Sequence, residues 1–203
     1  MPGRRAAEEE RKRQIIEAAH RVAARRGLER LTIREVAAAA GLSTGLVHFH
    51  FKRRDLLLIA LLDWVLETTT VLQVDERIEA IPEPLDRLLA LLRQEMDRLT
   101  RDRRRIHVFF DFWLLGTRDA QVRRRMRAEL KRYREAFRPM AEAVLTAEPE
   151  RFRGVTAEGL ASVVVGFIKG CAVQSVIDPT NFDVTQFLVA ANALLAQLEE
   201  THT

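Results

Sequence analysis

The chain has 203 residues, of which 47% are hydrophobic, and a formal net charge of +4. A chain of this length with this share of apolar residues can bury a hydrophobic core, so it is not expected to be disordered. Gly and Pro are scarce, and Ala, Leu, Arg and Glu recur at helical spacing, which indicates an all-helical protein without strands. The single cysteine, Cys171, excludes an intramolecular disulfide and fits a reducing cytoplasm. We expect a cytoplasmic protein, because the first 15 residues are charged and no apolar segment approaches the roughly 20 residues that span a bilayer.

Positive charge is concentrated at the front of the chain. Residues 1–55 hold 13 Lys and Arg against 7 Asp and Glu, a net +6, whereas residues 56–203 hold 20 against 22, a net −2. A basic module attached to a nearly neutral one is the pattern expected when only one end of a protein meets a polyanion.

The first two predicted helices span residues 8–26 and 32–40. Acids begin the first helix and arginines end it, as the helix dipole favours, and Gly27 stops it. Thr32 opens the second helix with Glu35 three residues later, which is a capping box. The apolar face of the first helix consists of Ile15, Ala18, Ala19, Val22 and Ala23.

A third helix of about two turns is predicted from Ser43 to about Phe51. Gly41 can take the positive φ of a sharp turn, Leu42 fills the core, and Ser43 caps the helix. Two short helices joined by a tight turn form a helix-turn-helix, whose second helix fits the major groove of DNA.

Six further helices follow along the chain. An apolar helix from Arg54 to about Val71 reads as a connector, because its apolar circumference must touch neighbours on more than one side. The remaining five are predicted at residues 84–101, 103–115, 119–146 with a kink at Pro139, 156–178 and 183–199. That makes about nine helices, with the boundary between modules inside the connector rather than in a flexible tether.

The start of the short third helix suits contact with DNA. Hydroxyls on Ser43 and Thr44 can meet base edges or phosphates, and Gly45 lets the backbone approach closely. His48 and His50, further along, come within reach of the sugar–phosphate wall. Because residues two apart on a helix point away from each other, these histidines cannot share a metal ion, and no metal site or cofactor is expected.

Cations flank that helix on both sides. Arg34 on the preceding helix can look into the same groove, and Lys52, Arg53 and Arg54 line its far edge, where phosphate contact is the common outcome. A solvated basic surface is the alternative for residues 52–54 taken alone. The turn geometry beside them favours DNA.

At these residues the sequence resembles the TetR family of one-component bacterial regulators. The matching pattern is Thr32, "AGLS" at 40–43, Gly45, Leu46, Val47, His48, Phe49, His50, Phe51, Arg54 and Asp55. It departs from the family at His48, where a tyrosine is usual, and at Arg54, where a lysine is usual. The resemblance implies DNA-binding roles for Thr32, Arg34, Thr44, Gly45, Leu46, His48 and His50. With Ser43, Lys52 and Arg54, which the helix start and the flanking charge indicate, these are the candidate DNA-binding residues.

The resemblance further implies a DNA-binding domain at residues 1–55 and a ligand-binding and dimerisation domain at 56–203. The aromatic run "HVFFDFWLLG" is the best candidate to line the ligand site. Asp111 and Trp113 could hold a cation, and residues 106–182 distantly resemble the effector domain of choline-responsive members, but an apolar or aromatic effector fits equally well. The candidate ligand-binding residues are His107, Phe110, Asp111, Trp113 and Phe167.

The last two helices are expected to pair with their copies in a second subunit. Gly166 and Gly170, four residues apart, give a face that another helix can approach closely, although ordinary packing within one chain is the alternative. The candidate interface residues are Val163, Gly166, Phe167, Gly170, Phe187, Ala191, Leu194, Leu195 and Leu198.

The sequence therefore predicts a dimeric, ligand-responsive transcription regulator, a repressor released from a palindromic operator by a small molecule. A non-specific nucleoid-associated protein is one alternative, but it would not need a large neutral domain. A helical enzyme with a site around His107 and Asp111 is another, but the sequence has no third ligand, glycine-rich phosphate loop or nucleophile motif beside them.

Overall fold

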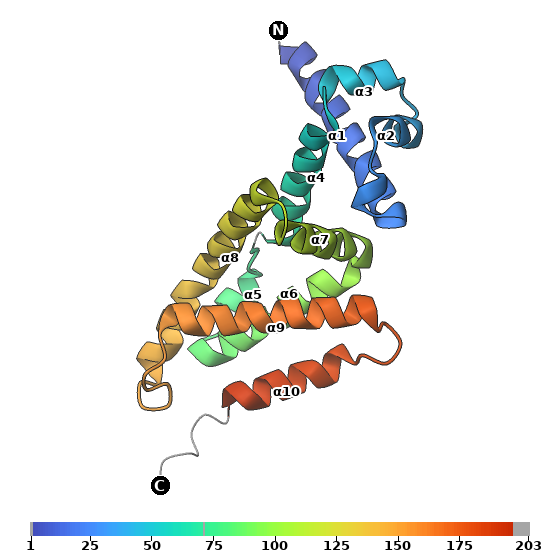
Figure 1. Ribbon diagram of the computed structural model, residues 1–203. Coiled ribbons are helices and arrows are strands. Elements are labelled where there is room, and N and C mark those ends of the chain that lie inside the picture. Colours follow the sequence, from blue (N-terminus) through green and yellow to red (C-terminus); the bar gives the residue numbers. More distant parts are fainter. Residues whose placement is uncertain (1, 71, 197–203) are drawn as a thin grey trace. The chain divides into compact units, whose positions relative to one another are not determined.

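The computed structural model describes residues 2–70 and 72–196, and these residues form helices without strands (Figure 1). The predicted all-helical fold is confirmed. The described part of the chain holds ten α-helices and one short 3₁₀ helix, η1 (Leu28–Arg30). The additional helix is α5 (Glu76–Glu79), a single turn in the segment that the sequence left between the connector and Pro84.

The other helices lie close to their predicted positions. The front half contains α1 (Pro2–Arg26), which begins earlier than expected, then α2 (Ile33–Ala40), α3 (Thr44–His50) and α4 (Arg54–Thr69). The rest are α6 (Pro84–Arg101), α7 (Arg103–Gly116), α8 (Ala120–Ala147) with Pro139 inside it, α9 (Ala157–Ile177) and α10 (Val184–Ala196).

The predicted caps form the turn between α2 and α3. The Thr32 side chain accepts a hydrogen bond from the Glu35 amide at 3.2 Å, and the Ser43 hydroxyl accepts one from the Leu46 amide at 3.1 Å. Gly41 has φ 66°, the left-handed conformation that residues with a Cβ rarely adopt. These local interactions fix where α2 stops and where α3 starts.

The chain divides into two compact units. The front unit consists of Met1–Thr69 and His107–Arg127, and the back unit of Thr70–Ile106 and Ala128–Thr203. The front unit is larger than the DNA-binding domain expected at residues 1–55, because it includes α4 and parts of α7 and α8. The functional boundary at residue 55 stays a prediction.

In the front unit, α1 packs against α2 and α4, and α2 against α3. One continuous core joins these helices to Phe109 and Phe112 of α7, both fully buried. At the edge of that core the His20 and Trp64 rings lie 5.1 Å apart, so α1 contacts the middle of α4. The Arg125 guanidinium donates to Asp63 at 2.7 Å and joins the start of α8 to α4.

In the back unit, α9 packs on α6, and α10 lies beside α9 (Figure 1) and also contacts α6. By length and composition, α9 is the only helix among the described residues that could cross a membrane, which differs from the expectation that no segment would approach that length. Half of the most apolar stretch of α9 is buried inside the protein. This is how the core helix of a soluble protein behaves, so α9 is weak evidence for a membrane span.

Candidate functional site

The helix that the sequence predicts to meet DNA is α3. Val47 is fully buried and Phe51 is 7% exposed, and these two residues hold one face of α3 against the core. Thr44, Gly45 and His48 are exposed, so the start and the outer face of the helix are open. The structure thus leaves the hydroxyl and the glycine predicted to meet DNA accessible from outside.

Leu46 and His50 are partly buried at the edges of that outer face. The Nδ1 atom of His50 is buried without a hydrogen-bond partner among the described residues, and the His50 ring lies 5.3 Å from that of Phe49 in an edge-to-face arrangement. Phe49, which the sequence analysis did not select, is 72% exposed.

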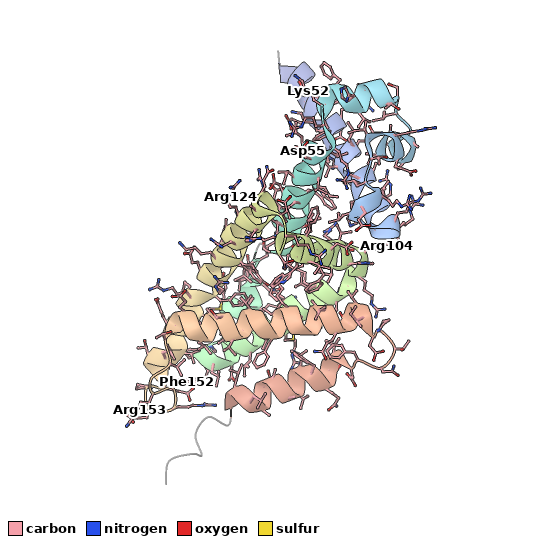
Figure 2. The ribbon with its side chains drawn as sticks, in the orientation of Figure 1. Lys52, Asp55, Arg104, Arg124, Phe152 and Arg153 are labelled. Atoms are coloured by element: carbon pink, nitrogen blue, oxygen red, sulfur yellow. The ribbon has the colours of Figure 1, made fainter. Side chains whose placement is uncertain are left out.

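The predicted cations differ in what they contact. Arg34 and Lys52 are exposed, and no residue in the described part of the chain bonds to either. Arg53 forms an ion pair with Asp55, with Nε 2.9 Å from Oδ1, and this pair lowers the pKa of Asp55. Lys52 and Asp55, labelled in Figure 2, lie in the segment where α3 gives way to α4. Arg34 and Lys52 are therefore the cations left available to a phosphate.

Arg54 is used inside the front unit. Its Nε donates to the Leu31 carbonyl at 2.6 Å and its Nη2 to the Leu28 carbonyl at 2.7 Å. These bonds join the start of α4 to the first residue of η1 and to the residue that follows η1. The phosphate contact implied for Arg54 stays a prediction, but two of its three nitrogens are already engaged.

A recess of about 420 Å³ lies at the start of α2 and is lined by Arg26, Arg30, Thr32 and Glu35. Arg26 donates to Glu35 at 2.7 Å, whereas the Arg30 side chain is exposed and bonds to no residue in the described part of the chain. Thr32 was predicted from its capping motif, but Arg30 was not, because a single arginine at the end of a 3₁₀ turn carries no motif. The recess adds a cation beside the helix cap that is expected to bind phosphate.

The candidate ligand residues on α7 fall on two sides of the helix. His107 Nε2 and Asp111 Oδ1 are 3.8 Å apart, and burial, opposed by His107, raises the pKa of Asp111. The Phe110 and Trp113 rings lie 6.2 Å apart. Since residues two apart on a helix point in different directions, Asp111 and Trp113 do not join in one cage by themselves. The structure thus brings these four residues together as two pairs, one polar and one aromatic.

Phe167 lies in the back unit, where its ring is 6.3 Å from that of Phe187. A separate recess of about 730 Å³ lies along α5, α6 and α10. It is lined by Asp75, Arg77, Ile78, Asp86, Leu89, Ala90, Arg93, Gln94, Asp97 and Asn192. The side-chain oxygen of Asn192 is buried and has no hydrogen-bond partner among the described residues. This recess was not predicted from the sequence.

The candidate interface residues separate into exposed and buried groups. Val163 is 47% and Leu194 61% exposed, and a Cβ added at Gly166 or Gly170 would meet no atom of the described residues within 4 Å. By contrast Ala191 and Leu195 are 2% and 4% exposed and pack within the subunit, while Phe167 and Phe187 are partly buried. Leu198 lies outside the described residues.

The exposed face of α9 and α10 also includes positions that the sequence analysis missed. Ile177 is 78% and Val189 55% exposed, and Ala190 and Ala193 are exposed beside Leu194. Together with Val163, Gly166 and Gly170 they form an open apolar face, which we call the α9–α10 face. A large open apolar face is a mark of an interaction surface.

The back unit buries a polar cluster that no sequence motif announced. The Tyr133 hydroxyl donates to Glu95 at 2.6 Å, and Arg98 donates to the same carboxylate through Nε at 2.9 Å. The ammonium of Lys169 lies 4.9 Å from the centroid of the Tyr133 ring. Burial, and to a smaller degree Arg98, lower the pKa of Lys169 to about 7 against the opposing effect of Glu95. We call these four residues the Glu95 cluster.

Family comparisons match both ends of this architecture. Residues 15–61 match the model described as "Bacterial regulatory proteins, tetR family", and residues 84–199 match the model described as "BetI-type transcriptional repressor, C-terminal". The second match alone covers more than half of the chain. The chain belongs to the TetR family of bacterial regulatory proteins. It is a ligand-responsive, DNA-binding transcriptional regulator.

Individual proteins are similar to this chain along most of its length. The chain is 27% identical over 170 residues to the HTH-type transcriptional regulator BetI of Burkholderia ambifaria strain MC40-6, a match that covers 83% of this chain and 86% of that relative. A putative transcriptional regulator from Saccharomonospora viridis, solved in complex with choline, has a TM-score of 0.70 and 20% identity over 93% of this chain and 97% of its own. AibR, solved in complex with isovaleryl coenzyme A and operator DNA, has a TM-score of 0.64 and 20% identity over 91% and 97%.

Family membership favours one of the interpretations left open by the sequence. The family consists of transcriptional regulators, which favours the regulator over a non-specific nucleoid-associated protein and speaks against an enzyme. Within the described residues, no group of three or more His, Cys, Asp or Glu side chains lies together in a way that could hold a metal ion. His107 and Asp111 have each other, without a third ligand.

Proposed function

We propose that this regulator is a homodimeric repressor that binds a palindromic operator and leaves it when a small molecule binds. The proposal rests on how α3 is exposed at the surface of the front unit. Its capped, hydroxyl-bearing start is exposed, its opposite face is locked by Val47 and Phe51, and the unpaired cations Arg34 and Lys52 flank it. A helix of this kind in the major groove, with phosphate contacts on either side, reads one half-site.

Two half-sites require two copies of α3, and the α9–α10 face supports dimerisation. Gly166 and Gly170 let a partner helix come close, while Val163, Val189 and Leu194 supply apolar area that is exposed in a single chain. Burial of such area is the main driving force of association. In a twofold symmetric dimer the same face on each subunit is used, and the two recognition helices then match a palindrome.

The core of the front unit offers a route by which an effector changes DNA binding. Phe109 and Phe112 of α7 share one core with α4 and α1, and the His20–Trp64 contact joins α1 to α4. Since packed cores switch between discrete arrangements instead of deforming smoothly, a ligand that moves α7 repacks the base of the helix-turn-helix. By linkage, the effector weakens operator binding by the same factor by which the operator weakens effector binding.

We place the effector contact on the aromatic side of α7, at Phe110 and Trp113. Trp113 is 39% exposed and makes ring contacts with both Phe109 and Phe110, so a flat or apolar effector can stack there. An organic cation would instead use Asp111, whose Oδ2 is buried and without a partner among the described residues. The protein is expected to act in the cytoplasm, together with the DNA it regulates.

The test uses the full-length protein. Binding duplexes are selected from a random pool, and the enriched sequence is examined for twofold symmetry. Small molecules that raise the unfolding temperature are then tested for release of the protein from that duplex. The test uses the wild type, Trp113→Ala at the proposed effector contact, and Asn192→Ala in the separate recess along α5, α6 and α10. The proposal expects a palindrome and release by at least one molecule, with the response lost in Trp113→Ala and retained in Asn192→Ala. An enriched sequence without symmetry, or hits that never release DNA, would overturn it.

A further inference from the structure

Phe49 is unusual among the aromatic residues of this chain. All ten phenylalanines lie within the described residues, and Phe49 is the only one that is exposed, at 72%. Burying a phenylalanine is strongly favourable, so an exposed ring forgoes a contribution to folding. Phe49 lies on α3, the helix that faces DNA in the proposed function, and its ring contacts only that of His50 at 5.3 Å among the aromatic contacts of the described chain.

Helix geometry places Phe49 in the middle of the outer face of α3. It follows Gly45 by four residues and Leu46 by three, so these three positions share a face, whereas Val47 and Phe51 lie on the buried face. Long side chains on a helix lean toward its N-terminus, which carries the ring toward the turn that holds Gly45. A Cβ at Gly45 would meet no atom of the described residues within 4 Å, so the space beside the ring is open.

The major groove offers one apolar group to such a ring. Thymine carries a C5-methyl group at the groove edge, and apolar side chains including phenylalanine read it by contact. The exposed neighbours of Phe49 on α3 mainly supply hydroxyl and imidazole groups, which can hydrogen-bond to bases or phosphates. Thr44 also has a methyl group, but it is much smaller than the Phe49 ring. Leu46 shares this face but is partly buried, so Phe49 is the large apolar residue that is exposed on it.

We infer that Phe49 determines operator specificity by packing against the methyl group of one thymine in each half-site. The inference rests on the proposed repressor function and adds a feature to the operator, a thymine at a fixed place in each half. It assigns to Phe49 a role in sequence choice and none in folding.

Deoxyuridine provides the test, because it differs from thymidine only by that methyl group. In the selected operator each thymine is replaced in turn by deoxyuridine, and the dissociation constant is measured by fluorescence anisotropy at one fixed salt concentration, since phosphate contacts make affinity salt-dependent. Loss of one buried methyl group weakens binding about fourfold, and symmetric replacement in both half-sites about fifteenfold. In Phe49→Ala the thymine and deoxyuridine duplexes should bind equally.

Leu56→Ala is the matched control. Leu56 is another exposed apolar residue of the front unit, at 49%, but it lies on α4 and not on the outer face of α3. This variant should keep the full preference for thymine. Both variants should unfold at the wild-type temperature, because neither side chain is buried.

The outcomes separate this inference from the proposed function. If the pool yields no enriched sequence, the operator proposal is wrong, and the thymine contact of Phe49 is wrong as well. If a palindrome is enriched but deoxyuridine is neutral at every position, or costs the same in the wild type and in Phe49→Ala, only the thymine contact is overturned.

Discussion

Replacing Lys169 by methionine tests the electrostatics of the Glu95 cluster. Lys169 is 7% exposed, and its pKa falls from 10.5 to about 7, mainly because burial disfavours the charged form. At about 1.4 kcal/mol per pH unit, the difference between these values corresponds to a cost of about 5 kcal/mol at neutral pH, which methionine removes. The lost contact with the Tyr133 ring and other polar interactions offset about 2–3 kcal/mol of that gain.

We therefore expect Lys169→Met to raise the free energy of unfolding by about 2–3 kcal/mol at pH 7. The gain should depend on pH in a fixed direction. Between pH 7 and 10.5 the unfolded wild type binds a proton on Lys169 that the folded protein does not, so wild-type stability rises with pH. The advantage of methionine should shrink across that window and should be at its full size below pH 7.

The assay is urea unfolding of both proteins at pH 7 and pH 9.5, at one protein concentration because association changes apparent stability. Lys131→Met is the control, since Lys131 is an exposed lysine of α8 that pairs with Glu135 at 3.5 Å, so methionine has no burial cost to remove there. Destabilisation of Lys169→Met by more than about 1 kcal/mol at pH 7, or a difference from the wild type that is the same at both pH values, would refute the reasoning.

Four other substitutions test the DNA-binding helices, the dimer surface and the stability of the front unit. Thr44→Ala and Arg34→Ala should each relax operator choice at one base position, by about 1–3 kcal/mol in electrophoretic mobility-shift titrations, while the dimer stays intact. Gly166→Leu should raise the dimer dissociation constant at least about fivefold in sedimentation experiments, because overpacking costs about 1–3 kcal/mol and the single subunit has room for the side chain. Arg54→Lys should lower the unfolding free energy by about 1–2 kcal/mol, because lysine cannot reproduce both carbonyl bonds.

Each of these expectations has a result that would contradict it. If the Thr44 and the Arg34 variants both keep the wild-type sequence preference, the assignment of base contacts to these two residues is wrong. Ala136→Leu adds a leucine to an exposed position on α8, and equal weakening of the dimer by this variant and by Gly166→Leu would show that the α9–α10 face is not special. Wild-type stability of Arg54→Lys would mean that the bonds to Leu28 and Leu31 are not important for the fold.

The helix-turn-helix could be predicted because its signals are local. Thr32, Gly41 and Ser43 fix the ends of α2 and α3 through caps and a left-handed turn within a few residues. The bonds of Arg54 could not be predicted in the same way, since its partners lie 23 and 26 residues earlier in the chain. From the sequence alone, an arginine at the start of the connector helix is interpreted as a phosphate ligand, because its tertiary partners are not known.

The dimer surface shows a different limit of sequence patterns. α10 is apolar around most of its circumference, so periodicity cannot tell Leu194, which is 61% exposed, from Leu195, which is 4% exposed. The Glu95 cluster was missed because Glu95 and Tyr133, 38 residues apart, meet only through the packing of α6 and α8. Phe49 was passed over because an aromatic residue in an apolar motif is usually core.

The most direct test of the account is the stoichiometry and symmetry of the operator complex. Native mass spectrometry of the full-length protein on the selected duplex should show an even number of chains, and footprinting should show two half-sites whose centres are about 10 base pairs, or a multiple of that distance, apart. A complex with one chain per duplex, or equal and steeply salt-sensitive binding to unrelated duplexes, would contradict it.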